Sequence, residues 1–348
     1  MPDGYPPCRR SRFRDAIAPL VTVLVVLLSG SSASLAEAPL SPVDAIGPPI
    51  GVIGETTHGR GRFILSYRFQ RQSFSGLMEG TNRLSGTLQG FRVRPTSMDQ
   101  DTHLFEALWS PFADLTLSVM LPYLHKVMSQ VDQNSGQSYQ TTSGGFGDLR
   151  VLALHQVFAD RNTRVHLKFG LSFPTGSTTQ SQVTPVSGGN LKRLPYAMQL
   201  GSGTVDLSPG ATYNGAWYFL YWGAQADGVL RAGTNAEDYT LGNAYAVTGW
   251  LGGRLSDWFN ASVRIDWNQW FNPEGQDALM APVLSPAADA QLQAGQRLDV
   301  LVGIDLLLGG ALKGTRLSIE GGCPVYQDLK GPQLRTGWLL NAGLQYAF

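Results

Sequence analysis

The chain ends with the stretch W-L-L-N-A-G-L-Q-Y-A-F, from Trp338 to Phe348, in which every second position counted back from Phe348 is apolar. The intervening residues, Ala347, Gln345, Gly343 and Asn341 among them, are mostly small or polar. Side chains alternate between the two faces of a β-strand, so a period of two predicts a strand with one apolar face.

The aromatic residue at the very end of this strand resembles the assembly signal of bacterial outer-membrane β-barrels. The resemblance implies that the rest of the chain forms a closed sheet in a lipid bilayer. It also implies two partners, the barrel-assembly machinery and outer-membrane lipid. The expected location is the outer membrane of a Gram-negative bacterium.

The N-terminus is typical of a secretory signal peptide. Four arginines between Arg9 and Arg14 precede an apolar run from Ala16 to Leu28, and Ser34 and Ala36 supply the small residues of a cleavage site. A membrane-anchor helix is the alternative, but the run is shorter than the roughly 20 apolar residues that a bilayer requires. We predict a signal peptide at 1–36, an irregular lead-in at 37–61, and an outer-membrane β-barrel at 62–348. The lead-in is expected to be either a periplasmic segment or a partial plug of the lumen.

Composition excludes some functions but does not decide the fold. The chain has 26 basic and 26 acidic residues, and the leader takes four Arg and two Asp, which leaves 22 against 24 and a net charge of −2. This balance lacks the basic excess of nucleic-acid-binding proteins, so we expect no nucleic-acid partner. Only Cys323 remains after the leader, so no disulfide forms within the mature chain.

Several other segments alternate as the C-terminal one does, and they predict an all-β transmembrane antiparallel barrel of about twelve strands. The regular segments begin near Phe63, Leu115, Val165, Phe259, Leu298 and Leu317. Less regular strands are expected near 102–109, 145–158, 198–213, 217–231 and 239–254.

The predicted connections alternate in length. Those at 110–114, 159–164, 214–216, 255–257 and 309–314 are short, while those at 73–100, 129–144, 176–197, 232–238, 272–296 and 327–333 are mostly longer. A membrane barrel with both termini in the periplasm requires this order of short turns and long outer loops. A soluble β-sandwich has no reason to keep it.

The polar face of these strands carries charges, which a membrane barrel places around a wet interior. We predict that the lumen is lined by Arg68, Arg150, His166, Lys168, Asp227, Arg264, Asp266, Asn268, Asp299, Asp305, Arg316 and Glu320. The patch of Arg264, Asp266 and Asn268 near Asp299 and Asp305 has two interpretations. It is either a selectivity filter or an ion-pair network that stiffens the wall. Tryptophans near strand ends, such as Trp258 and Trp270, are expected in interfacial girdles.

Particular strings point to one family. G-F-G-D-L-R at 145–150, L-S-F-P-T-G-S at 171–177 and L-G-S-G-T at 200–204 occur together with the ending Q-Y-A-F. Over most of the mature chain this sequence resembles the outer-membrane barrel family named after the meta-pathway of phenol degradation. The resemblance implies a transport barrel without catalytic residues. Some relatives carry a Met/His-rich string where 51–76 here keeps only His58, so a soft-metal role is not expected.

No chemistry of an enzyme or cofactor is indicated. The histidines do not stand at metal-ligand spacings, and no cysteine cluster occurs, so we predict neither a metal site nor a cofactor. An outer-membrane lipid hydrolase is the enzymatic alternative, since phospholipase A of that membrane is a twelve-stranded barrel. Its His-x-Ser-Asn-Gly string is absent, so we expect no enzyme.

The sequence therefore predicts a barrel that passively transports small molecules. The family's name and the apolar residues Leu279, Met280, Val283 and Leu284 of a long loop favour aromatic or hydrophobic compounds as substrates. That loop is expected either to fold into the mouth or to pack on neighbouring loops. The rival interpretation is a non-conducting structural barrel of the envelope, filled by its own side chains.

Overall fold

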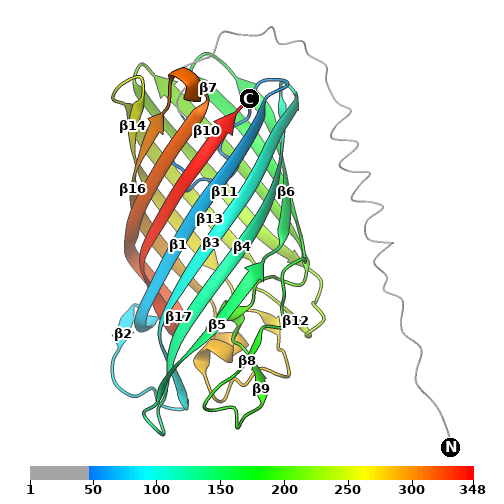
Figure 1. The fold of residues 1–348 in the computed structure, drawn as a ribbon, viewed down its shortest axis with the longest axis vertical. Helices are drawn as coiled ribbons and strands as arrows, with labels where there is room; N and C mark the ends of the chain where they lie inside the picture. The colour runs from blue at the N-terminus through cyan, green and yellow to red at the C-terminus, as the bar shows by residue number, and fades with distance from the viewer. Residues whose placement is uncertain (1–46) are drawn as a thin grey trace, which may run out of the picture. The chain divides into compact units, whose positions relative to one another are not determined.

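The computed structural model describes residues 47–348, and most of them form one antiparallel sheet that closes into a barrel (Figure 1). The predicted signal peptide and the first part of the predicted lead-in lie outside these residues. The strands of the closed ring are β1 (Phe63–Gly80), β3 (Val93–Phe112), β4 (Leu115–Asp132), β6 (Leu149–Ala159), β7 (Thr163–Phe173), β10 (Val205–Trp217), β11 (Leu220–Ala232), β13 (Ala244–Arg254), β14 (Phe259–Trp270), β16 (Gly295–Leu307) and β17 (Thr315–Ala347).

The ring closes because β17 pairs with β16 along one half and with β1 along the other. Every neighbouring pair in the ring is antiparallel, so the two halves of β17 run in opposite directions, with the reversal near Gly331. The main sheet has thirteen strands, and β2 (Asn82–Leu84) and β5 (Ser138–Phe146) lie outside the ring, which leaves eleven. Counting both halves of β17, the wall has twelve passes, as the sequence pattern predicts.

The connections make the two ends of the barrel unlike. At one end, which we call the short-turn end, β3, β6, β10, β13 and β16 each pass to the next wall strand through a short connection. The longest connections, 174–204 and 271–294, lie at the opposite, long-loop end. The first contains the paired strands β8 (Ser181–Val183) and β9 (Leu191–Arg193). The second contains β15 (Glu274–Gly275), which pairs with β12 (Tyr239–Thr240) in the connection at 233–243. Both ends of the barrel chain meet at the short-turn end, where the Phe348 amide donates to the Phe63 carbonyl at 2.9 Å.

The barrel is polar inside and apolar outside, the reverse of a soluble protein. Ser118 and Asn260 are 0% exposed, whereas Leu167 and Ile265 are 51% and 53% exposed. Alternation along each strand places these two sets on opposite faces. An exposed apolar wall around buried polar groups is stable only where hydrocarbon covers the outside. The predicted fold class, an outer-membrane type of β-barrel, is confirmed.

No helix within residues 47–348 is long and apolar enough to cross a membrane. The short 3₁₀ turns η1 (Tyr196–Met198), η2 (Pro286–Ala288) and η3 (Ala290–Leu292) lie in the long loops, and η4 (Gly310–Leu312) lies in a connection of the short-turn end.

Three sequence predictions of detail are wrong. Strands β1, β3 and β4 continue through stretches predicted as loops, because cross-strand contacts such as Ser73 with Asp99 at 2.7 Å replace apolar packing there. The turn predicted at 214–216 lies at Tyr218 and Phe219 instead, with Tyr218 in the left-handed region at φ 53°. Residues 198–204 form no strand and belong to the long loop before β10.

Trp258 is 61% exposed, in keeping with the predicted girdle at the barrel's outer edge. Trp270 is different, because its ring nitrogen donates to the Gln293 carbonyl at 2.7 Å. It ties β14 to the loop at 271–294 and does not belong to the girdle.

Candidate functional site

Residues 47–58, which we call the lumen segment, are held against the inner face of the barrel. The Arg316 guanidinium donates to the carbonyls of Gly47 and Pro48 near the short-turn end. At the other end of the segment, the His58 amide donates to Thr116 Oγ1 at 3.0 Å. The chain therefore enters the barrel, reverses inside it and leaves from the same end before β1 begins.

The middle of the lumen segment gives its backbone carbonyls to donors from several strands. Each of the contacts in this set joins a wall side chain to one carbonyl: Arg68 Nη1 to Val52 at 3.1 Å, Lys168 Nζ to Ile53 at 3.0 Å, His166 Nε2 to Gly54 at 2.9 Å, Gln225 Nε2 to Ile53 at 3.1 Å, and Asn214 Nδ2 to Glu55 at 2.8 Å. A buried carbonyl without a partner is costly, so these donors make an irregular backbone tolerable inside the barrel.

Two glycines permit this path. A Cβ on Gly51 would stand 2.2 Å from Arg264 Nη2 and 2.2 Å from Glu320 Oε2, so no larger residue fits between them without displacement. Gly54 has φ +64°, which favours glycine at the point of reversal.

Apolar side chains of the lumen segment complete its fit. Ile50 and Val52 are each 2% exposed. Val52 packs with Ala216, Tyr221 and Trp250, and the partly buried Ile53 packs against a second group formed by Leu104, Met120, Leu152 and Leu154. The segment is therefore seated by shape as well as by hydrogen bonds.

The wall beneath Gly51 contains a fully hydrogen-bonded ion pair. Arg264 donates to Glu320 through Nε at 2.8 Å and Nη2 at 2.9 Å, and Asn341 Nδ2 donates to Glu320 Oε2 at 2.9 Å. Arg264 Nη1 also lies 3.2 Å from Asp266 Oδ2, and Asn268 donates to that carboxylate at 3.0 Å. Such a bidentate pair fixes both side chains in one geometry.

The remaining residues predicted to line the lumen are placed as follows. Lys168 pairs with Asp227 at 2.6 Å, Arg316 with Asp305 at 2.8 Å, and Asp299 with Arg297 at 2.8 Å. The predicted patch is therefore divided among three separate ion pairs, because Asp266 pairs with Arg264, Asp299 with Arg297 and Asp305 with Arg316. Arg150 lies on β6 and is exposed within the barrel's inner face.

The long-loop end is covered by a second structure, which we call the loop cap and define as residues 191–200, 235–241 and 277–290. Met198, 0% exposed, packs with Leu194, Met98 and Met128 on the inner wall. Tyr196, Tyr239 and Met280 join the three parts of the cap in one apolar cluster, with the two tyrosine rings 5.0 Å apart. Burial raises the pKa of Tyr239, so its hydroxyl stays protonated.

Polar contacts also hold the cap. Lys126 Nζ on the inner wall donates to the carbonyls of Ala197 at 2.8 Å and Gln199 at 2.7 Å. Within the cap, the Arg193 guanidinium lies 2.7 Å from the Asp277 carboxylate. Of the two expectations for the loop at 272–296, the buried Met280 agrees with packing on neighbouring loops, because it contacts the cluster of Tyr196 and Tyr239. Leu279 and Val283 remain 64% and 80% exposed.

Sequence reasoning missed Lys126, Gln225 and Asn214. Gln225 lies on the same inward parity as Asp227 and was available from the strand pattern. Asn214 was not predicted to face the lumen because a turn was predicted at its position. Nothing in the sequence pairs Lys126 with a loop 71 residues away.

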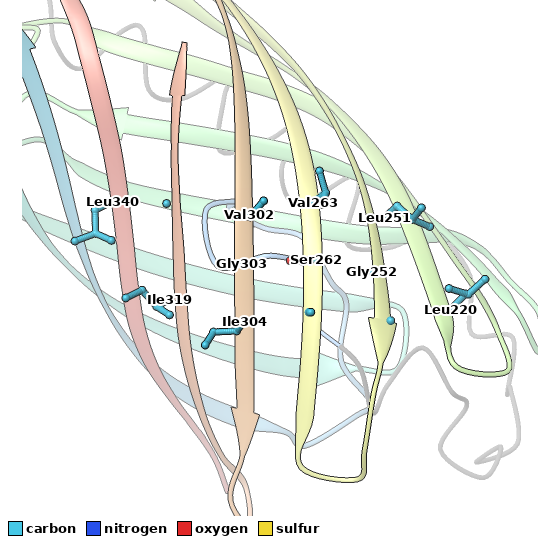
Figure 2. A pocket seen from close by; sticks show the side chains of 13 residues that line it. Leu220, Leu251, Gly252, Ser262, Val263, Val302, Gly303, Ile304, Ile319 and Leu340 are labelled. Carbon is cyan, nitrogen blue, oxygen red and sulfur yellow. The ribbon is translucent and has the colours of Figure 1, made fainter. Parts of the chain in front are cut away.

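A groove of about 720 Å³ also occurs on the outer wall, and Figure 2 shows it across β11 to β17. Leu251, Val263, Val302, Ile319 and Leu340 line it, all apolar and outward-facing. It belongs to the surface that faces hydrocarbon and is separate from the lumen. Within residues 47–348, no group of three or more acidic, histidine or cysteine side chains is arranged to hold a metal ion.

No protein-family description matches the sequence, and no curated protein is detectably similar to it. Among solved structures, the chain is similar to the COG4313 outer membrane channel from Pseudomonas putida F1, with a TM-score of 0.61 and 13% identity over 85% of this chain and 98% of that one. It is less similar to the transport unit of the autotransporter AIDA-I from Escherichia coli, with a TM-score of 0.46 and 9% identity over 96% and 98% of the two chains. A Pseudomonas aeruginosa FadL homologue gives a TM-score of 0.39 and 7% identity over 82% and 90%. At 13% identity the likeness to the COG4313 channel shows the fold of an outer-membrane barrel alone, and function has to be argued from the site.

Proposed function

We propose that this chain is a gated channel of the Gram-negative outer membrane that passively admits small molecules. The observation that carries the proposal is the way the lumen segment is bound inside the barrel. Its carbonyls accept from Arg68, Lys168 and His166 through separate, non-covalent bonds, while the wall behind it keeps its own ion pairs. A closure of this kind is reversible, because the wall stays intact when the segment leaves.

The orientation of the protein in the membrane follows from the difference between the two ends of the barrel. Short turns and both chain ends are typical of the periplasmic side, and long loops of the outside. On this assignment the lumen segment closes the path from the periplasm and the loop cap closes it from outside. The terminal Phe348, whose ring lies 5.6 Å from Phe63 at the strand junction, is then the residue that we propose the barrel-assembly machinery recognises.

The rival proposal is a structural barrel that never conducts. Its strongest support is the dense packing of Ile53 against Leu152 and Leu154, which are 4% and 0% exposed. We favour the channel because both closures are made by chain segments that lie apart from the wall. In a permanently filled barrel, wall side chains alone are sufficient to occupy the interior.

We further propose that the protein is not a hydrolase. That chemistry needs a serine hydroxyl within hydrogen-bond reach of a histidine base. Instead, the His103 ring bonds to the Tyr67 hydroxyl at 2.8 Å and the His166 ring to the Gly54 carbonyl at 2.9 Å. Aromatic or hydrophobic substrates, and membership in the phenol meta-pathway family, remain part of the proposal and rest on the strings at 145–150 and 171–177.

The test is solute flux into liposomes that contain the purified protein. A panel of aromatic acids, alkanes and metal ions would be compared with protein-free liposomes. Uptake of small solutes that saturates only weakly with concentration supports a passive channel. Absence of uptake for every solute, together with absence of ionic current in planar bilayers, would leave the structural barrel as the better account.

A further inference from the structure

The basic side chains on the inner face are, with one exception, already neutralised or hydrogen-bonded. Carboxylates or carbonyls within reach serve Arg68, Lys126, Lys168, Arg231, Arg264, Arg297 and Arg316. Among residues 47–348, no hydrogen bond or ion pair reaches the guanidinium of Arg150. An arginine without a partner inside a barrel is unusual, because a guanidinium carries five donors.

Arg150 faces inward and is accessible to water. It lies opposite Met120 on one side and Ser172 on the other, and these are 1% and 4% exposed on the inner face. Alternation gives Leu152 and Leu154 of the same strand the same orientation, and both contact the group around Ile53. Arg150 itself is exposed, so the inner face is open to solvent at this position.

Along the barrel, Arg150 lies between the lumen segment and the loop cap. Leu152 and Leu154, where the lumen segment packs, lie toward the short-turn end of β6. Lys126, which holds the loop cap, pairs with Ser143 on β5, beyond the long-loop end of β6. A solute on its way between the cap and the lumen segment therefore passes Arg150.

The carboxylates near Arg150 are occupied by other donors. Asp148 accepts from the Gly176 amide at 2.9 Å, the Ser202 amide at 2.8 Å and the Ser202 hydroxyl at 2.9 Å. Asp206 pairs with Arg231 and accepts from the Thr204 hydroxyl at 2.6 Å. Both acids are held by other donors, and neither makes a hydrogen bond to Arg150, so the donors of this guanidinium remain available to a ligand.

We propose that Arg150 is the binding site for the carboxylate of a small monoanion in the permeation path. A guanidinium binds a carboxylate through two parallel hydrogen bonds, with geometric specificity. The charged neighbours of Arg150 are Arg231, which pairs with Asp206, and Asp148, whose oxygens accept from the Gly176 and Ser202 amides. A ligand with one negative charge pairs with the guanidinium of Arg150. The second charge of a divalent anion would be repelled by the two aspartates, so monocarboxylates bind better than divalent anions.

This inference rests on the proposed channel, but a binding measurement separates the two. Saturation-transfer NMR with benzoate as the probe, on the full-length protein in detergent, reports weak binding without requiring conduction. The variants are Arg150→Gln, Arg150→Lys and, as the matched control for net charge, Arg161→Gln in an exposed turn at the short-turn end. Circular dichroism would confirm that each variant keeps the barrel.

We expect benzoate to bind the wild type and the Arg161→Gln variant equally, and the Arg150→Gln variant at least about tenfold more weakly, as loss of a charge-assisted bond implies. Arg150→Lys would restore part of the affinity, and acetate would displace benzoate better than inorganic phosphate does. Equal binding by Arg150→Gln, or no binding by the wild type, would overturn the site. Failure of the channel itself would show separately, as binding that depends on Arg150 in a protein that passes no solute.

Discussion

Replacing Gly51 by leucine is the sharpest way to unseat the lumen segment without changing the wall. The added Cβ would stand 2.2 Å from both Arg264 Nη2 and Glu320 Oε2, inside their van der Waals radii. Either the segment moves or the ion pair between those two side chains opens. The ion pair has two hydrogen bonds of 2.8 and 2.9 Å and a third partner in Asn341, so we expect the segment to move.

The magnitude follows from the cost of overpacking. Forcing extra carbons into a close-packed site costs about 1–3 kcal/mol. Since 1.4 kcal/mol corresponds to a factor of ten in an equilibrium constant, the seated state would lose about 5- to 140-fold in population relative to the open one. The barrel itself keeps its stability, because none of its residues is altered.

Single-channel recording in planar bilayers measures this change directly. We expect Gly51→Leu to open more often than the wild type under the same voltage and salt. Gly59→Leu is the matched control, because a Cβ at Gly59 meets no atom within 4 Å. If Gly51→Leu and Gly59→Leu record alike, the lumen segment does not control the path and the reasoning is refuted.

Further perturbations test other parts of the account. Lys126→Met removes both hydrogen bonds to the loop cap, so the fraction of time that the channel is open should rise about tenfold or more in bilayer recordings. Lys192→Met, at an exposed position, should leave this fraction unchanged. Equal open fractions in the two variants would contradict the proposal that the loop cap closes the channel. Val263→Arg places a charge on the lipid-facing wall and should lower the free energy of unfolding in vesicles by about 2–4 kcal/mol, whereas an unaltered urea midpoint would argue against a membrane-facing surface. The Arg92 guanidinium holds the pKa of Asp132, outside the membrane-spanning wall, well below its usual range. The contact is therefore complete above the ordinary aspartate pKa of about 3.9 and is lost only as pH falls through the lowered value. Hydrogen exchange of the backbone amides around Arg92 should then stay slow from pH 7 to 4 in the wild type and be fast in Asp132→Asn. Fast exchange in the wild type already at pH 4 would contradict the lowered pKa of Asp132.

The sequence was sufficient for the barrel because the lipid imposes a strict pattern. Leu167 and Ile265 face hydrocarbon and His166 and Arg264 face inward, so period two appears directly in the chain. The pattern fails where the lipid ends. Ser73 and Asp99 continue β1 and β3 into water through polar cross-strand contacts, which have no apolar signature.

The candidate site could be predicted from the sequence only in part. Parity alone places Lys168 and Arg316 inside, but their contacts with Ile53 and Pro48 are to backbone carbonyls, and every residue type offers a carbonyl. No sequence pattern distinguishes a segment whose carbonyls accept hydrogen bonds inside a lumen from an ordinary loop. The loop cap could not be predicted for a related reason. Met198 is buried against Met98 and Met128 of the wall, and Met280 against Tyr196 and Tyr239 of other loops, all distant in sequence.

The most direct measurement of the central claim is ionic current through a variant that lacks residues 47–57, recorded beside the wild type in the same bilayer. Removing this stretch takes away the carbonyls held by Arg68, Lys168 and His166 and leaves β1 to begin as before. The account expects the variant to pass a larger and steadier current than the wild type. A variant that folds into the same barrel and passes no current would contradict the account and leave a structural barrel in its place.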